Sequence, residues 1–176
     1  MKLKKVIISG APGTGKSSII KELKNRGYFC YDEVWEKKYE NPNQKNNSNH
    51  INIFSKHLFL ERLKQLEKTV NKKVKDQVIF YDRSIIDTIS YLNTYKKNIE
   101  TLWLDIAYKK RYYETIFLCP LWEEIYEQCE DRKESFKESM LIEKNLTSSY
   151  KNFLYKIKHV PKVDISNRVD YILLNI

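Results

Sequence analysis

Short runs of apolar residues alternate with amphipathic stretches along this chain. The apolar runs end at polar residues or glycine, which is typical of buried parallel strands. Between them, apolar residues recur at spacings of three and four, which predicts helices packed on a sheet. The predicted strands cover 4–10, 28–32, 77–82, 113–119 and 159–165, and the predicted helices cover 16–27, 51–72, 84–95, 99–110, 134–157 and 166–176.

This alternation predicts a doubly wound, three-layer α/β domain with a five-stranded parallel sheet. Ligands of such domains bind beyond the carboxyl ends of the strands, and Gly10 and Asp82 both stand at such ends. A length of 176 residues suits one core, because cores grow to about 100–200 residues before they split. We therefore expect a single domain over 1–176.

Capping residues mark several of the predicted boundaries. Gly27 suits the C-cap of the first helix, and Ser84 and Ser166 suit the N-caps of two later ones. The stretch 41–50 is polar and rich in asparagine, which predicts a mobile surface loop. Pro120 breaks the fourth strand because proline cannot donate to the ladder.

The composition of the chain narrows its possible partners and leaves the predicted fold unchanged. The chain has no run of about 18 apolar residues and no signal-peptide pattern, so we expect no membrane span and a cytoplasmic protein. Cys30, Cys119 and Cys129 lack C-x-x-C spacing, which favours free thiols in a reducing compartment. The net charge is +9, but the lysines are dispersed, which favours solvated helix faces. Binding of nucleic acid or anionic lipid remains the alternative.

The segment 10–17 reads GAPGTGKS and matches G-x-x-x-x-G-K-[ST] in full, between a predicted strand and a predicted helix. The glycines let the backbone curl so that several N–H groups converge on phosphates at the positive end of the helix. Lys16 would reach the β- and γ-phosphates, and the Ser17 hydroxyl would ligate Mg²⁺. The predicted nucleotide-binding residues here are Gly10, Ala11, Pro12, Gly13, Thr14, Gly15, Lys16, Ser17 and Ser18.

Asp82 and Arg83 follow the third predicted strand. An acidic residue at this place is expected to hold Mg²⁺ through a bound water, although a turn or N-cap aspartate is the alternative. The Arg83 guanidinium, close to the phosphate loop, offers bidentate recognition of a phosphate or of an acceptor that carries a carboxylate. Both residues are therefore candidates for the catalytic set, together with Lys16.

Two further charged segments are candidates for the acceptor side. Asp32 and Glu33 end the second strand, where a carboxylate could orient an attacking hydroxyl or take its proton; we favour Glu33. Arg132 and Lys133 lie in the charged link before the long helix. A cation from a closing link would neutralise charge on the transferring phosphoryl group. Ordinary strand-end charges and a solvated helix start are the alternative readings.

With these residues in view, the chain resembles small bacterial P-loop proteins of an AAA-like ATPase class, which are similar to the kinase part of ribosylnicotinamide kinases. The resemblance rests on VIISGAPGTGKSSIIKELKNRGYFCYDE, VIFYDRSIIDTISYL and IFLCPLWEEIYEQCEDRKESFKE. The DRS triplet also looks like the strand-end signature of deoxynucleoside kinases. The resemblance implies the strand order 2-3-1-4-5, Glu33 as the base, Arg83 as the acceptor-side cation, and Arg132 with Lys133 as a lid.

The function predicted from these features is Mg²⁺- and ATP-dependent phosphoryl transfer to a small hydroxyl acceptor, nucleoside-like or ribosylnicotinamide-like. The segment DEVWEKKYE departs from the family's run of small residues after the second-strand acid, which leaves the acceptor undefined. The base-binding loop expected near 164–168 has no N-K-x-D pattern for guanine; we expect ATP, and the sequence does not exclude GTP. A nucleotide-dependent regulatory ATPase or GTPase switch is the second hypothesis, and a basic nucleic-acid or lipid binder is the third.

Overall fold

The computed structural model describes residues 3–34, 48–68, 70, 74–126 and 134–176. In this part of the chain, five parallel strands form one sheet in the order β2-β3-β1-β4-β5. The predicted order 2-3-1-4-5 is thereby confirmed. The strands are β1 (Lys4–Ser9), β2 (Phe29–Tyr31), β3 (Val78–Asp82), β4 (Thr115–Leu118) and β5 (Lys156–His159).

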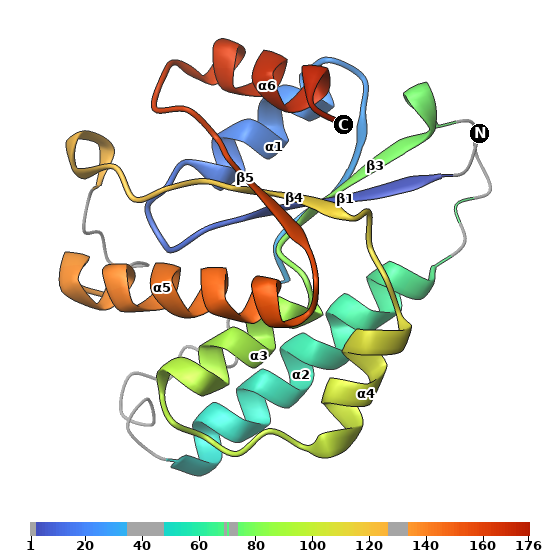
Figure 1. Ribbon diagram of the computed structural model, residues 1–176. Coiled ribbons are helices and arrows are strands. Elements are labelled where there is room, and N and C mark those ends of the chain that lie inside the picture. The colour runs from blue at the N-terminus through green and yellow to red at the C-terminus, as the bar shows by residue number, and fades with distance from the viewer. Residues whose placement is uncertain (1–2, 35–47, 69, 71–73, 127–133) are drawn as a thin grey trace.

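Helices cover both faces of the sheet (Figure 1). On one face lie α1 (Lys16–Asn25) and α6 (Ile165–Leu174), which pack on each other. The other face carries α2 (Ser48–Glu67), α3 (Ile85–Thr94), α4 (Thr101–Lys109) and α5 (Phe136–Asn152). Two short 3₁₀ turns, η3 (Lys75–Gln77) and η4 (Glu123–Ile125), precede β3 and follow β4. No helix in the described ranges is long and apolar enough to cross a membrane.

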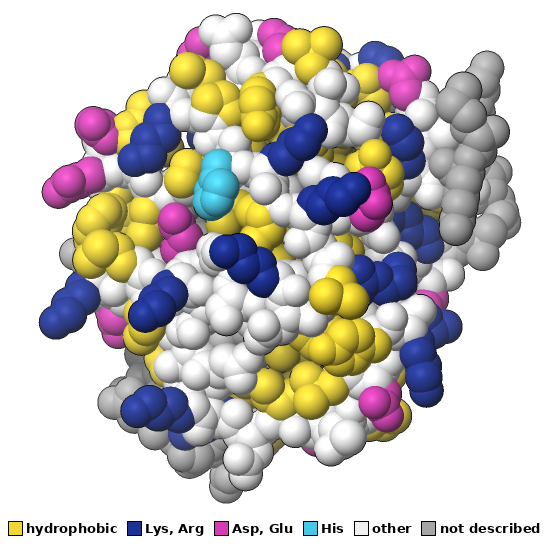
Figure 2. Space-filling view, in the orientation of Figure 1, with side chains coloured by type: hydrophobic (Ala, Val, Ile, Leu, Met, Phe, Trp, Pro, Cys, Tyr) yellow, Lys and Arg dark blue, Asp and Glu magenta, His cyan; other side chains and the backbone are white. Residues whose placement is uncertain are grey.

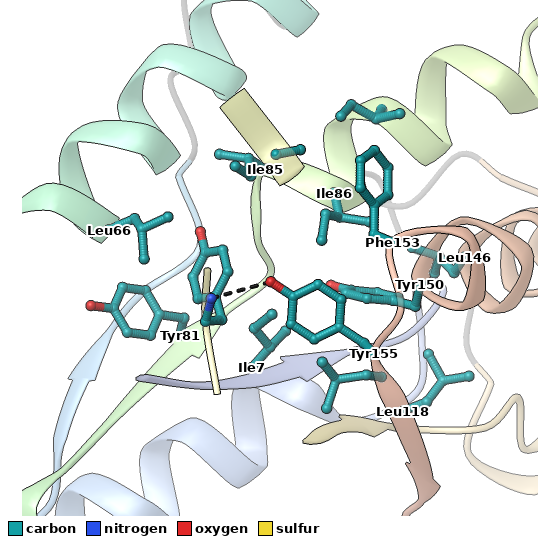
Figure 3. Packing of buried hydrophobic residues seen from close by; sticks show 14 of the residues in the cluster. Ile7, Leu66, Tyr81, Ile85, Ile86, Leu118, Leu146, Tyr150, Phe153 and Tyr155 are labelled. Atoms are coloured by element: carbon teal, nitrogen blue, oxygen red, sulfur yellow. Dashed lines mark hydrogen bonds between the residues drawn. The ribbon is translucent and has the colours of Figure 1, made fainter. Parts of the chain in front are cut away.

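The sheet divides the hydrophobic core into two clusters because successive side chains of a strand point to opposite faces. Val6 and Ile8 pack toward α1 and α6, whereas Ile7 packs toward α3 and α5. Figure 3 shows this second cluster, in which Leu118 of β4 and Tyr150 of α5 lie near Ile7. Burying one such side chain contributes about 1.5–3 kcal/mol. The core therefore fixes the strand ends from which the site residues emerge.

Of the predicted capping residues, Ser84 stands where the sequence placed it, whereas Gly27 lies one residue beyond the C-cap of α1, which is Arg26. Gly27 follows α1 with a φ of +85°, and its N–H donates to the Lys24 carbonyl at 2.9 Å. Ser84 caps α3, because its hydroxyl accepts from the Ile86 N–H at 3.1 Å. The Asp87 carboxylate completes the capping box by accepting from the Ser84 N–H at 2.8 Å.

The fifth strand and the helix before it differ from the prediction. The helix predicted over 134–157 ends at Asn152, and β5 is Lys156–His159 instead of 159–165. Leu154 adopts a left-handed conformation with a φ of +60°, which terminates the helical path. Since β5 is an edge strand with exposed and half-buried side chains, its sequence lacks the apolar run on which the prediction relied.

Two helix starts also differ. The N-cap of α6 is Asp164, whose carboxylate accepts from the Asn167 N–H at 3.1 Å, and not Ser166. Aspartate caps a helix as well as serine does, so residue type alone does not distinguish these two positions. Helix α2 begins at Ser48, inside the stretch predicted as a loop, and ends at Glu67. The earlier part of that stretch lies outside the described residues.

Candidate functional site

The glycine-rich segment joins β1 to α1 at the carboxyl end of the sheet. Gly10 has a φ of +148°, and a Cβ at this position would lie 2.5 Å from the carbonyl oxygen of Cys119. Real Cβ atoms do not approach a backbone oxygen so closely, so only glycine fits where the loop passes β4. The loop is thereby held against the sheet at its first residue.

The other end of the loop begins α1. Its N-cap is Gly15, which has no side chain with which to cap the helix. The first N–H groups of α1 are therefore not satisfied by a capping side chain and remain available to an anion at the positive end of the helix dipole. Ser17 and Ser18 in the first turn are exposed. The phosphate-binding role of the segment stays a prediction, for which this helix start leaves N–H groups free of a capping side chain.

Lys16 is folded back into the loop. It is only 5% exposed, and its Nζ donates to the Ala11 carbonyl at 2.8 Å. The Thr14 hydroxyl donates to the same carbonyl at 2.9 Å. Burial, followed by the neighbouring Arg83 guanidinium, lowers the pKa of Lys16 to about 8. An ammonium has three N–H donors, so Lys16 can keep the bond to Ala11 and still donate to a bound phosphate.

Ser17 and Asp82 line one hollow of about 380 Å³ beside the phosphate loop. Asp82 is 3% exposed, and its Oδ1 has no hydrogen-bond partner among the described residues. Burial, with Glu33 as the second cause, raises the pKa of Asp82 to about 6. An orphaned carboxylate oxygen next to a hydroxyl suits Mg²⁺, which binds oxygen ligands and keeps several of its waters. The residues present therefore fit the ion that the motif implies.

Arg83 connects the phosphate loop to the end of β2. Its φ of +71° is a left-handed conformation that costs a non-glycine residue about 1–2 kcal/mol. The backbone N–H donates to the Ile8 carbonyl at 3.0 Å, which holds the residue at the end of β1. The guanidinium donates through Nη1 to the Gly10 carbonyl at 3.0 Å and through Nε to Glu33. The left-handed backbone of Arg83 therefore places its guanidinium where it bonds both to the phosphate loop and to Glu33.

Two arginines face the Glu33 carboxylate. Arg83 donates to Oε1, and the Nη2 atom of Arg62 lies 3.8 Å from the same oxygen. Burial alone would raise the pKa of Glu33, but Arg83, Lys16 and Arg62 outweigh burial and lower it. Glu33 is thus a carboxylate at neutral pH, opposite the phosphate loop.

The structure separates the two carboxylates that end β2. Asp32 forms an ion pair with Lys24 of α1 at 2.6 Å, and its side chain is 70% exposed. Glu33 instead turns inward to Arg83 and Arg62. Of the two carboxylates, Glu33 is the one that faces inward, and its role as the base stays a prediction.

Arg62 was missed by the sequence analysis. It lies on α2, is buried, and donates from Nη1 to the Thr88 hydroxyl at 2.8 Å. Its position three residues after Phe59 and four before Leu66, both buried, puts it on the core face of the helix. A cation among the apolar positions of an amphipathic helix was the signal that could have revealed it.

Asp87 was also missed, and its carboxylate links the elements that carry the site residues. Its carboxylate accepts from the Ser9 hydroxyl at 2.6 Å and from the Ser84 hydroxyl at 2.9 Å. The Tyr150 hydroxyl of α5 donates to it as well. These bonds tie the end of β1 to the start of α3, so they fix the turn that carries Arg83.

The structure leaves several of the predictions from the sequence untested. Arg132 and Lys133, the predicted lid, and Cys129 lie outside the described part of the chain. Cys30 and Cys119 are free thiols, as expected, and both are buried. Lysines and arginines on the face seen in Figure 2 are scattered among hydrophobic and acidic side chains and do not form a continuous patch.

Comparisons with solved structures agree with the fold. A deoxyadenosine kinase from M. mycoides with bound dATP superposes with a TM-score of 0.72 at 18% identity, covering 97% of this chain and 98% of that one. A thymidylate kinase from Ehrlichia chaffeensis gives 0.64 at 12% identity, covering both chains fully. The NadR protein in complex with NR gives 0.69 at 16%, covering 96% of this chain and 51% of that one. The fold is that of the P-loop nucleotide kinases.

Sequence comparisons place the chain in a family. It is 26% identical over 152 residues to nucleotide-binding proteins from two strains of Aliivibrio fischeri. The match covers 85% of this chain but 45% of those proteins, so the chain spans less than half of their length. A family model described as an AAA domain matches residues 5–168. Because this match covers nearly the whole sequence, the chain belongs to that AAA-domain family of P-loop proteins.

Proposed function

We propose that the protein is an ATP- and Mg²⁺-dependent phosphotransferase that acts on a hydroxyl group of a small, nucleoside-like acceptor. One observation carries the proposal: the Glu33 carboxylate is held opposite the phosphate loop by Arg83, which also binds the Gly10 carbonyl of that loop. Holding a nucleotide requires no carboxylate at this place. A transfer reaction does, because the acceptor hydroxyl has to be oriented toward the γ-phosphate.

The donor half of the proposed site consists of the loop 10–17 and the first turn of α1. Backbone N–H groups and Lys16 would bind the phosphates, and Ser17 with Asp82 would hold the metal, Asp82 through water. Bound Mg²⁺ would neutralise charge on the phosphoryl oxygens. Pre-organised positive groups of this kind carry most of the catalysis in phosphoryl transfer, since little covalent chemistry falls to the protein.

The acceptor half is built around Glu33. Its carboxylate would accept a hydrogen bond from the acceptor hydroxyl and aim the oxygen at the γ-phosphorus. The new O–P bond forms as the bond to the leaving ADP breaks, and the hydroxyl proton passes to Glu33. Since the lowered pKa of Glu33 makes it a weak base, orientation is its main contribution, and the proton leaves late in a loose transition state.

The nucleoside-like acceptor rests on two supports. The DRS triplet at the end of β3 resembles the signature of deoxynucleoside kinases, and here its arginine contacts the proposed base. Solved proteins with the same fold include a deoxyadenosine kinase and NadR bound to NR. An acceptor that offers a ribose-type hydroxyl would suit a site in which Glu33 is the acid that turns inward after β2.

The test is an acceptor screen with MgATP, in which mass spectrometry detects the phosphorylated acceptor and not free phosphate. Deoxynucleosides, ribonucleosides and nicotinamide riboside are the first candidates. Glu33→Gln is expected to lower kcat by about 10²–10⁴-fold and to leave the Kd of ATP within about threefold. Asp32→Asn is the matched control and should retain activity, because Asp32 pairs with Lys24 at the surface.

The opposite outcome is equally specific. Slow phosphate release with every acceptor, unchanged in the Glu33→Gln variant, would rule out phosphoryl transfer. The regulatory ATPase or GTPase switch would then be the better reading, and partner binding that differs between the ATP and ADP states would be its sign.

A further inference from the structure

The C-terminal helix touches the phosphate loop through one residue. Arg168 of α6 is 1% exposed, and its Nη2 donates to the Thr14 carbonyl at 2.9 Å. The two residues are 154 positions apart in the sequence. Arg168 lies in the stretch expected to bind the base, but that expectation does not account for its contact with the phosphate loop.

The guanidinium lies directly against the backbone of the loop. A Cβ at Gly15 would lie 2.7 Å from the Nη1 atom of Arg168 and 3.7 Å from the Cδ1 atom of Ile125. Gly15 also has a φ of +79°, which side chains rarely adopt. The backbone conformation favours glycine before the lysine, and an added Cβ would also displace the guanidinium of Arg168 from its place against the loop.

Burying the charged guanidinium of Arg168 destabilises the folded protein unless its N–H groups find partners. Its Nε and Nη1 atoms have no hydrogen-bond partner in the described ranges. The thiol of Cys119 lies beside it, but burial raises the pKa of Cys119 to about 11 despite the guanidinium, so this neighbour is neutral at pH 7. A buried charge without a carboxylate partner costs stability, and a purely structural position would be better filled by an apolar side chain.

The direction of the hydrogen bond suggests what this residue does. The structure contains no cis peptide bond in its described parts, and in a trans peptide the C=O and the following N–H point in opposite directions. When Arg168 holds the Thr14 carbonyl on the α6 side of the loop, the Gly15 N–H must point to the opposite side, where the phosphates bind.

We infer that Arg168 is a positioning residue for nucleotide binding: it fixes the peptide between Thr14 and Gly15 so that the Gly15 N–H faces the phosphates. Its positive charge also lies just behind the loop and adds to the field that attracts an anion. This inference rests on the nucleotide-binding part of the proposed function and does not depend on the acceptor.

The first test compares the Kd of MgATP, measured by isothermal titration calorimetry, in the wild type and in Arg168→Met. Methionine keeps most of the buried stem but cannot donate to Thr14. We expect binding about 10- to 100-fold weaker, the range for loss of a charge-assisted hydrogen bond. Arg168→Lys keeps a donor and the charge, and should restore part of the affinity.

Arg26→Met is the matched control. Arg26 binds Glu22 at 2.8 Å and the Ser166 hydroxyl at 2.8 Å, and it pairs with Asp170, so it ties α6 to α1 without touching the loop. This variant should lower the melting temperature and leave the Kd of MgATP within about twofold. Equal losses of affinity in Arg26→Met and Arg168→Met would mean that only helix docking matters, which would overturn the inference.

A second measurement reports on the peptide itself. In ¹H–¹⁵N spectra of the nucleotide-free protein, the Gly15 amide resonance should move in Arg168→Met and Arg168→Lys but not in Arg26→Met. If Arg168→Met does not fold, Arg168→Lys carries the test, and wild-type affinity with an unmoved Gly15 resonance would overturn the inference. Failure of the wild type to bind MgATP would instead overturn the proposed function.

Discussion

Replacing Asp82 by asparagine should make the nucleotide-free protein more stable at neutral pH. Asp82 is 3% exposed, and burial together with Glu33 raises its pKa from the ordinary 3.8 to about 6. The folded protein therefore holds this proton at pH values where the unfolded chain has lost it. The free energy of unfolding therefore falls as the pH rises from 3.8, and it has lost the full contribution of this group above about pH 6.

The size of the effect follows from the two pKa values. At about 1.4 kcal/mol per pH unit, the interval between 3.8 and about 6 corresponds to about 3 kcal/mol at pH 7.5. The same linkage gives about 1 kcal/mol at pH 4.5. Asparagine is close in shape and does not ionise, so Asp82→Asn avoids this cost. The attraction of Lys16 and Arg83, which lowers this pKa, is already contained in the value of about 6 and is not subtracted again.

The assay is urea unfolding of the wild type and the variant at pH 7.5 and pH 4.5, without nucleotide. The gain in the free energy of unfolding should be larger at pH 7.5. Asp32→Asn is the control and should change stability by less than about 0.5 kcal/mol at both pH values, because this exposed pair contributes little. In the same variants, MgATP should raise the melting temperature of Asp32→Asn but not of Asp82→Asn.

A destabilised Asp82→Asn at pH 7.5, or a change of the same size at both pH values, would refute the reasoning. The first result would mean that the carboxylate is already satisfied by a partner. The second would mean that its pKa is not raised. An unaltered response of Asp82→Asn to MgATP would separately remove the residue from the proposed metal site.

Substitutions at two more residues test the same site. Lys16→Met should weaken MgATP binding at least 100-fold by calorimetry. It should not lower the melting temperature of the nucleotide-free protein, because burial of the ammonium, which lowers the pKa of Lys16 to about 8, destabilises the fold. A large drop in melting temperature would contradict this. Arg83→Gly and Arg83→Ala should both lose transfer activity. By urea unfolding, Arg83→Gly should be about 1 kcal/mol more stable than Arg83→Ala, because glycine adopts the φ of +71° without strain. Equal stability of the two variants would argue against backbone strain at this position.

The parts of the site that the sequence predicted are those with a local pattern. The phosphate loop and Asp82 stand at strand ends, and each strand before them is a continuous apolar run. The same logic failed at β5, whose edge position leaves its side chains exposed or half-buried. Arg62 was not predicted, and its partner Thr88 lies 26 residues away along the chain. Arg168 fell in the stretch expected to bind the base, but its bond to Thr14, 154 residues away, was not predicted.

The two halves of the proposed site come from opposite faces of the sheet. The donor half belongs to the face of α1 and α6, where Arg168 holds the loop. The acceptor half belongs to the face of α2 and α3, which supplies Arg62 and the turn after β3. Arg83 bonds to both halves, through Gly10 and Glu33. A phosphate-loop motif therefore says little about the acceptor, because the helix that completes the acceptor side is separate in sequence and shows only an amphipathic pattern. Under this proposal, the identity of the acceptor is decided on the α2 face, while nucleotide binding is decided on the other.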